Sequence, residues 1–135
     1  MSVLGVGMDL VELRGFAEQL EAPGSSFTGE TFTAAELSSA RGSSGPAAHL
    51  GARFAAKEAF IKAFSVAILG RAPVVDELDW REIEVANDPW GRPTLALHGS
   101  VAEAVASTLG PIRIQLSLTH EPNNAGAMVL IEGEQ

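Results

Sequence analysis

The stretch Arg53-Phe-Ala-Ala-Lys57-Glu58-Ala-Phe-Ile-Lys62 decides how the rest of this sequence is interpreted. Its mixture of alanine, aromatic and charged residues predicts a helix, which we expect to run from about residue 48 to residue 67. On a helix, Glu58 and Lys62 project from the same side, and Arg53 and Lys57 form a neighbouring stripe. Three of the nine basic residues of the chain fall in these ten positions, so the helix is a candidate site for an anion. The plainer alternative is an amphipathic helix that carries two surface ion pairs.

Before this helix, residues 3–11 (VLGVGMDLV) predict a strand with two different faces. One face carries only apolar side chains, and we expect it to face the core. Its residues are Leu4, Val6, Met8 and Leu10. The opposite face carries Val3, Gly5, Gly7 and Asp9. Two glycines beside a carboxylate leave room for another group to approach the backbone, and the alternatives are a bulge or tight packing.

The remaining segments predict an α+β fold. A capping box at 33–36 indicates a short helix, and a second one at 100–103 indicates a helix that ends at 110–111. Strands are expected at 83–85, 94–97, 112–118 and 126–132. This order is typical of a mainly antiparallel sheet with helices packed on one face, and we expect residues 1–135 to form a single domain.

Composition narrows the classes of protein further. The 135 residues include no cysteine, which excludes a disulfide scaffold and a thiolate metal site and fits a reducing compartment such as the cytoplasm. Seventeen acidic against nine basic residues give a net charge of −8, which argues against nucleic acid as a partner. The apolar runs are too short to span a membrane, and Asp9 interrupts the apolar N-terminus, which argues against a signal peptide.

Two clusters could carry chemistry. Asp9 on the glycine-flanked strand and Glu58 on the helix could converge on one hard cation such as Mg²⁺, with Lys62 beside the phosphates of a substrate. The sequence by itself does not show that the two carboxylates meet. The second cluster is Ser117-Leu-Thr119-His120 at the end of a regular strand. It lacks the nucleophile elbow that precedes a catalytic serine, so a polar strand end is the simpler interpretation.

Five segments follow, in order and at matching spacing, the motifs of one enzyme family. They are residues 5–12 (GVGMDLVE), 32–37 (FTAAEL), 53–63 (RFAAKEAFIKA), 83–93 (IEVANDPWGRP) and 117–120 (SLTH). The third is the most specific, because it matches the family pattern R-[FW]-A-[AV]-K-E-A-x-x-K-A. The chain therefore resembles the holo-acyl-carrier-protein synthases, the small bacterial class of 4′-phosphopantetheinyl transferases, over nearly its whole length.

The resemblance implies an activity and a set of site residues. The family moves phosphopantetheine from coenzyme A to a serine of an apo acyl carrier protein, or of a carrier domain within a fatty acid synthase, and releases adenosine 3′,5′-bisphosphate. It implies Asp9 and Glu58 as Mg²⁺ ligands and Glu58 and Lys62 as catalytic residues. The residues that it implies for coenzyme A binding are Arg53, Lys62, Arg92, Pro93, Thr119 and His120.

The resemblance also implies partners and an assembly. Family members of this size are typically homotrimers with each active site between two subunits, so we expect Arg92 and Pro93 to reach a nucleotide bound by a neighbouring subunit. For carrier docking, the segment 12–21 offers Arg14 with the apolar Phe16 and Leu20. Residues 65–79 read SVAILGRAPVVDELD where the family commonly continues K-A-x-G-x-G. Two rival functions stay open, a non-catalytic carrier- or nucleotide-binding module and a metal-dependent phosphohydrolase that acts on coenzyme A.

Overall fold

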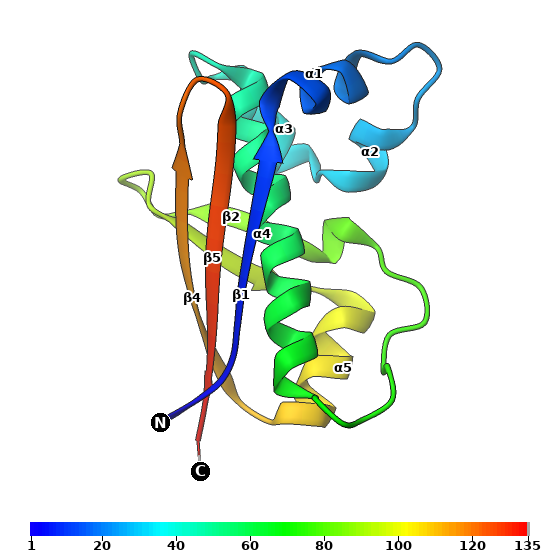
Figure 1. The fold of residues 1–135 in the computed structure, drawn as a ribbon, viewed down its shortest axis with the longest axis vertical. Coiled ribbons are helices and arrows are strands. Elements are labelled where there is room, and N and C mark those ends of the chain that lie inside the picture. The colour runs from blue at the N-terminus through cyan, green and yellow to red at the C-terminus, as the bar shows by residue number, and fades with distance from the viewer. Residues whose placement is uncertain (135) are drawn as a thin grey trace.

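In the computed structural model, which describes residues 1–134, a long helix crosses one face of a three-stranded antiparallel sheet (Figure 1). The strand order is β1 (Ser2–Glu12), β5 (Asn124–Gly133), β4 (Ile112–His120). The helix is α4 (Pro46–Ala67), and a separate hairpin of β2 (Ile83–Asn87) and β3 (Pro93–Leu97) packs beside it. The shorter elements are α1 (Leu13–Glu21), α2 (Phe27–Thr31), α3 (Ala34–Arg41), the 3₁₀ turn η1 (Trp80–Glu82) and α5 (Gly99–Leu109). The α+β class and the antiparallel pairing are confirmed.

The close contact between α4 and β1 depends on two glycines. A Cβ atom on Gly7 would overlap the carbonyl oxygen of Ala59 and lie 2.6 Å from the amide nitrogen of Ala63. A Cβ atom on Gly5 would overlap the carbonyl oxygen of Ala63. Both alternatives, tight packing and a bulge, are present, since the pairing of β1 with β5 shifts between Val3 and Gly5. The glycine face of β1 therefore receives the helix.

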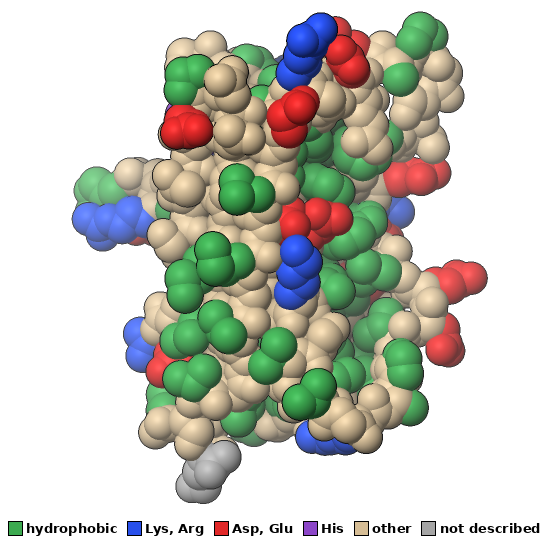
Figure 2. Space-filling model, in the orientation of Figure 1, with side chains coloured by type: hydrophobic (Ala, Val, Ile, Leu, Met, Phe, Trp, Pro, Cys, Tyr) green, Lys and Arg blue, Asp and Glu red, His purple; other side chains and the backbone are tan. Residues whose placement is uncertain are grey.

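The prediction that Leu4, Val6, Met8 and Leu10 of β1 face the core is wrong for three of these four residues. Val6, Met8 and Leu10 are 42%, 63% and 71% exposed, and only Leu4, beside the bulge, packs against the core. The reason is steric: the backbone of α4 can approach β1 closely only over Gly5 and Gly7, which have no Cβ atoms. The outer face of the sheet therefore carries apolar side chains, which Figure 2 shows spread over the strands that lie in front of α4. Met128 of β5 belongs to the same exposed surface.

A buried ion pair and its hydrogen bonds join four elements, α4, α3, η1 and β2. Lys57 is completely buried, and its Nζ donates to Glu36 Oε1 at 2.9 Å and to the carbonyl oxygens of Trp80 and Ile83 at 3.0 and 2.7 Å. The second oxygen of Glu36 accepts from the amide of Val85 at 2.9 Å. The suggestion that this stripe of α4 forms a surface ion pair is wrong, because Lys57 ties α4 to α3 and to the start of β2.

The two predicted capping boxes have opposite outcomes. At the start of α3, Thr33 and Glu36 cap each other's backbone amides, as predicted. At the start of α5, Ser100 and Glu103 form no such box. The carboxylate of Glu82 instead accepts from the amides of Ser100 and Val101 and from the Ser100 hydroxyl, so a residue of η1 caps the helix from the other side of the β2–β3 hairpin.

The helix α1 contributes an aromatic side chain to the core. Phe16 is only 4% exposed and contacts the rings of Phe27, Phe32 and Phe54 at centroid distances of 5.7 to 6.3 Å. The expectation that Phe16 docks a carrier protein is therefore wrong, because no partner can reach it. Within residues 1–134, none of the helices combines the length and the apolar character that a membrane span requires.

Candidate functional site

Asp9, Glu58 and Lys62 meet at the contact between β1 and α4. Lys62 Nζ lies 3.0 Å from Asp9 Oδ1. The other oxygen of Asp9, Oδ2, is buried and has no hydrogen-bond partner. Asp9 lies two residues after Gly7 on the same face of β1. The close approach of α4 at Gly7 therefore places the Asp9 carboxylate beside the side chains of Glu58 and Lys62. The convergence that the sequence left open is present.

The pKa of Glu58 reflects this crowding. Burial first, and then the neighbouring Asp9 carboxylate, raise the pKa of Glu58 from 4.5 to about 7, whereas the charge of Lys62 opposes the shift. Two carboxylates with one lysine between them therefore hold more negative charge than the site compensates. A cation that bound both oxygens would remove the repulsion.

Mg²⁺ fits these residues. It usually takes one or two protein carboxylates and completes its coordination with water and substrate phosphates. Among the described residues 1–134, no group of three or more His, Cys, Asp or Glu side chains is placed to hold a metal ion. The buried Oδ2 of Asp9 has no partner and can donate a lone pair to a metal ion, and the carboxylate of Glu58 can donate another. These oxygen donors suit a hard cation, which the phosphates of a substrate would also bind.

A second polar group surrounds a cavity of about 180 Å³ at the N-terminal end of α4. His49 and Arg53 line it from the helix, and His120 lines it from the end of β4. The Arg53 guanidinium donates to the carbonyl of His49 at 3.4 Å and to Asn87 Oδ1 at 3.3 Å. Burial, and then the charge of Arg53, lower the pKa of His49, whose Nε2 is buried without a partner.

His49, which lines this cavity, was not singled out in the sequence. The available signal was its position four residues before Arg53, which places both on one side of a helix. The shared cavity could not be inferred locally, because His120 reaches it from the end of β4, about seventy positions further along the chain. Arg92 and Pro93 lie at the tip of the β2–β3 hairpin, where Arg92 is 3.6 Å from Asp88 and stacks 5.6 Å from the ring of the exposed Trp90.

Comparisons with known proteins agree with one another. The model of the ACPS family, described as the 4′-phosphopantetheinyl transferase superfamily, matches residues 5–116. The holo-[acyl-carrier-protein] synthase of Mycobacterium tuberculosis is 47% identical over 98% of both chains, and that of Nocardia farcinica is 44% identical over 98% of this chain and 89% of its own. The ACPS–CoA complex of Chronobacterium ammoniagenes has a TM-score of 0.90 and 44% identity, with 97% of this chain and 98% of that chain covered.

The chain belongs to the 4′-phosphopantetheinyl transferase superfamily. Its relatives by sequence are holo-acyl-carrier-protein synthases, so the chain is an enzyme of that transferase type. The family match includes Asp9, Arg53, Glu58, Lys62 and Arg92. Thr119 and His120 lie beyond the matched range, at the C-terminal end of the edge strand β4.

The two polar groups of this phosphopantetheinyl transferase lie apart within one chain. Arg53 and Glu58 are about 140° apart around the helix axis, because each residue turns an α-helix by about 100°. Arg53 points to β2 and to His120, whereas Glu58 and Lys62 point to Asp9 on β1. The residues 53–62 therefore do not form one continuous anion-binding surface, contrary to the simplest interpretation of their sequence.

The remaining predicted residues are divided between the two faces of the sheet. Thr119 lies beside Leu10 and Gly126 on the outer face, where it lines a second shallow cavity with His120. Of the carrier-docking residues, Arg14 is exposed and lies 3.8 Å from Glu18, and Leu20 packs partly against the core. A carrier protein could therefore contact Arg14 but not Phe16.

Proposed function

We propose that this enzyme transfers the 4′-phosphopantetheine group of coenzyme A to a serine of an apo acyl carrier protein or carrier domain, and releases adenosine 3′,5′-bisphosphate. The observation that carries the proposal is the meeting of Asp9, Glu58 and Lys62 at one point on two different elements. The likeness to the ACPS–CoA complex supports coenzyme A as the donor. The serine nucleophile belongs to the carrier, so this chain needs none of its own.

In this proposal Asp9 and Glu58 would hold Mg²⁺ at the site where the pyrophosphate of coenzyme A binds. The bound ion would supply charge neutralisation for the leaving bisphosphate. Glu58 and Lys62 are the catalytic residues of the chain: Glu58 fixes the cation, and the ammonium of Lys62 faces the same phosphates and stabilises the negative charge that develops there. Positioning and electrostatics account for the rate, as in phosphoryl transfer generally.

The nucleotide end of coenzyme A is assigned to the second polar group. Arg53, Arg92, Pro93, Thr119 and His120 would hold the adenosine and its phosphates, with Lys62 at the pyrophosphate. Support comes from the cavity between His49, Arg53 and His120, which gathers cationic and hydrogen-bonding groups in an otherwise acidic protein. Since this group faces away from Glu58, the two ends of one coenzyme A molecule would contact different subunits.

The assembly follows from the same reasoning. We infer a homotrimer in which the outer face of the sheet is covered by other copies of the chain. Val6, Met8, Leu10 and Met128 form an apolar surface of a kind that monomeric proteins rarely leave open. Two sets of residues would then come together at each interface. The Arg53 group (Arg53, His120 and the assigned Arg92) of one chain would lie towards the Asp9 group (Asp9, Glu58 and Lys62) of the next. Residues 1–135 would act as a single domain in the cytoplasm, in fatty acid synthesis.

Mass spectrometry of candidate apo carrier proteins tests this function. Incubation with coenzyme A and Mg²⁺ should add phosphopantetheine to the carrier serine and release adenosine 3′,5′-bisphosphate. Binding of coenzyme A without any product would favour the non-catalytic module. Cleavage of coenzyme A in the absence of a carrier would favour the phosphohydrolase. Either result would overturn the proposal.

A further inference from the structure

The N-terminal half of α4 holds a cation that no carboxylate neutralises. Arg53 is only 9% exposed, yet none of the salt bridges formed within residues 1–134 includes its guanidinium. Both oxygens of the nearby Glu36 are hydrogen bonded to Lys57 and to backbone amides instead. Burial lowers the pKa of Arg53 more than the charge of Glu36 raises it. The positive charge of Arg53 is therefore left for a ligand.

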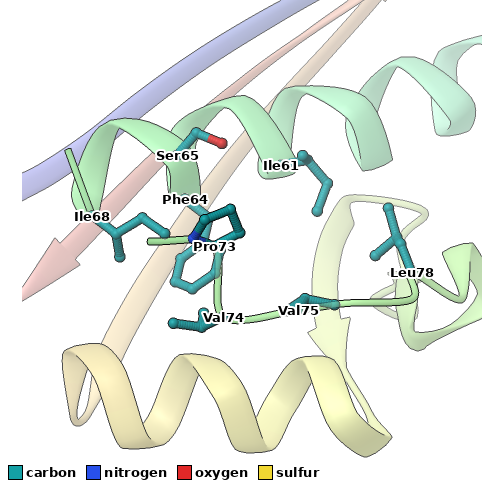
Figure 3. Close-up of a pocket in the computed structure, with 8 residues that line it drawn as sticks. All are labelled: Ile61, Phe64, Ser65, Ile68, Pro73, Val74, Val75 and Leu78. Atoms are coloured by element: carbon teal, nitrogen blue, oxygen red, sulfur yellow. The ribbon is translucent and has the colours of Figure 1, made fainter. Parts of the chain in front are cut away.

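The apolar pocket at the other end of α4 offers no such charge. It has a volume of about 210 Å³ and lies between the C-terminal half of the helix and the segment 73–78 (Figure 3). Figure 3 shows hydrocarbon side chains from both elements around it, and Ser65 is the only polar residue in its lining. Of these two cavities, only the one beside Arg53 has a charged side chain that can meet a nucleotide phosphate.

The side chain of Asn87 lies against the Arg53 guanidinium. Asn87 is the last residue of β2, on the same face of the hairpin as the buried Ile83 and Val85, and this face packs on α4. Its Oδ1 accepts a hydrogen bond from Arg53 Nη2 at 3.3 Å. Its Nδ2 donates to Ser39 Oγ at 3.5 Å, so the amide is held from two sides.

The partners of Arg53 orient it without neutralising it. Arg53 Nη1 donates to the carbonyl oxygen of His49, and Arg53 Nη2 donates to Asn87, and both acceptors are uncharged. A guanidinium has five N–H donors, so the remaining donors can bind the oxygens of a ligand. A carboxylate in place of the Asn87 amide would form an ion pair with Arg53 and would compete with an anionic ligand.

We propose that Asn87 is a positioning residue for nucleotide binding: its amide directs Arg53 towards a phosphate of the nucleotide and leaves the charge of Arg53 to that phosphate. The inference rests on the proposed function, which assigns Arg53 to the nucleotide end of coenzyme A. Asn87 itself need not touch the nucleotide. Its contribution should therefore appear in the affinity for the nucleotide and should depend on the presence of Arg53.

Calorimetric titration with adenosine 3′,5′-bisphosphate tests this role, because that ligand contains the nucleotide and lacks the pantetheine arm. Asn87→Ala should weaken binding about threefold, since one hydrogen bond to a charged group is lost. Asn87→Asp should weaken it roughly tenfold, because the new carboxylate pairs with Arg53 and repels the phosphates. Thermal unfolding should give the opposite order, with Asn87→Asp more stable than Asn87→Ala, since the new ion pair stabilises the folded chain.

Thr94→Asp is the matched control. Thr94 is exposed on β3, and because it pairs with Ala86 it lies on the opposite face of the hairpin from Asn87. The variant adds the same charge to the same hairpin away from Arg53, so its affinity for adenosine 3′,5′-bisphosphate should stay close to that of the wild-type protein.

Two further measurements separate positioning from a general structural role. In an Arg53→Ala background, Asn87→Ala should cause no additional loss of affinity, because the group that Asn87 orients is gone. In steady-state transfer assays, Asn87→Ala should raise KM for coenzyme A and leave kcat near the wild-type value, because Glu58 and Lys62 are untouched.

The outcomes separate the inference from the proposed function. Tighter binding by Asn87→Asp than by Asn87→Ala, or an equal loss from Asn87→Ala with and without Arg53, would overturn the positioning role. Transfer to an apo carrier by the wild-type protein would still support the proposed function in either case. Failure of the wild-type protein both to bind adenosine 3′,5′-bisphosphate and to modify a carrier would overturn both.

Discussion

At the level of the single residue, Glu58 makes the stability of the free enzyme depend on pH. Folding raises its pKa from 4.5 to about 7, chiefly by burial and secondarily through Asp9. Between these values the folded chain keeps a proton that the unfolded chain has lost. The contribution of Glu58 therefore falls as the pH rises from about 4.5 to about 7, and stays at its lowest above that range.

Glu58→Gln should therefore stabilise the metal-free protein at pH 8. Allowing for solvent screening of a half-buried group, we expect a gain of about 1 kcal/mol, or about 4 °C in Tm, and a smaller gain at pH 5. Thermal unfolding in chelator measures both. Glu77→Gln, on an exposed loop, should leave Tm unchanged at either pH. Added Mg²⁺ should raise Tm of the wild-type protein but not of Glu58→Gln. A destabilised Glu58→Gln at pH 8 would contradict the assignment of a crowded carboxylate pair.

The two lysines of α4 should respond differently to removal. Lys62→Ala removes a mostly exposed ammonium beside Asp9, so we expect only a small loss of Tm, a higher KM for coenzyme A and a lower kcat. Lys57→Ala strands the buried Glu36 carboxylate, which should cost about 3–5 kcal/mol of stability. Steady-state kinetics and thermal unfolding of both variants check this. Similar Tm losses in the two variants would mean that their environments have been confused.

At the level of elements, the contact of α4 with β1 tests the role of glycine. Gly7→Ala places a methyl group against the backbone of Ala59 and Ala63, so the helix must move away from the strand. We expect a loss of about 3 kcal/mol and a loss of transferase activity, because the same movement separates Asp9 from Glu58. Gly29→Ala in α2 is the control, since a methyl group there meets no atom within 4 Å and should be neutral or stabilising. Chemical denaturation supplies the comparison, and a fully stable Gly7→Ala would refute the close-packing argument.

The same strand shows how far sequence reasoning reaches. The extent of β1 could be predicted from local pattern, and Asp9 and Glu58 could be named as candidates for one cation site, but the sequence did not show that the two carboxylates meet. The face of β1 could not be predicted, because hydrophobic alternation favours Val6, Met8 and Leu10 inside, whereas the backbone of α4 fits only over glycine. Lys57 was misjudged for a similar reason. Its burial depends on Glu36 and on carbonyl groups more than twenty positions away, which no local period reveals.

At the level of the whole molecule, mixing inactive chains tests whether two subunits share a site. Glu58→Gln damages the Asp9 group and Arg92→Glu damages the Arg53 group, so co-expression should restore activity at interfaces that combine the intact halves. Random association in equal amounts would restore about a quarter of the wild-type activity in a cyclic assembly.

The control for this experiment uses two variants of the same group. Glu58→Gln mixed with Asp9→Asn should recover nothing, because every interface then lacks one of the two carboxylates. Light scattering of the wild-type protein should give the mass of three chains. A monomeric mass, together with no recovery in the first mixture, would reject the shared site.

The alternation of β1 between glycine and large apolar residues also determines how freely the strand can vary over evolutionary time. Glycine is the only amino acid without a Cβ atom, so Gly5 and Gly7 have no acceptable replacement beneath α4. Val6 and Met8, on the outer face, need only remain apolar and of similar size for the next subunit. In a saturation library across residues 5–10, tolerance to substitution should consequently alternate from one residue to the next. The intolerant positions should be those on the face of β1 that the hydrophobic pattern assigns to solvent.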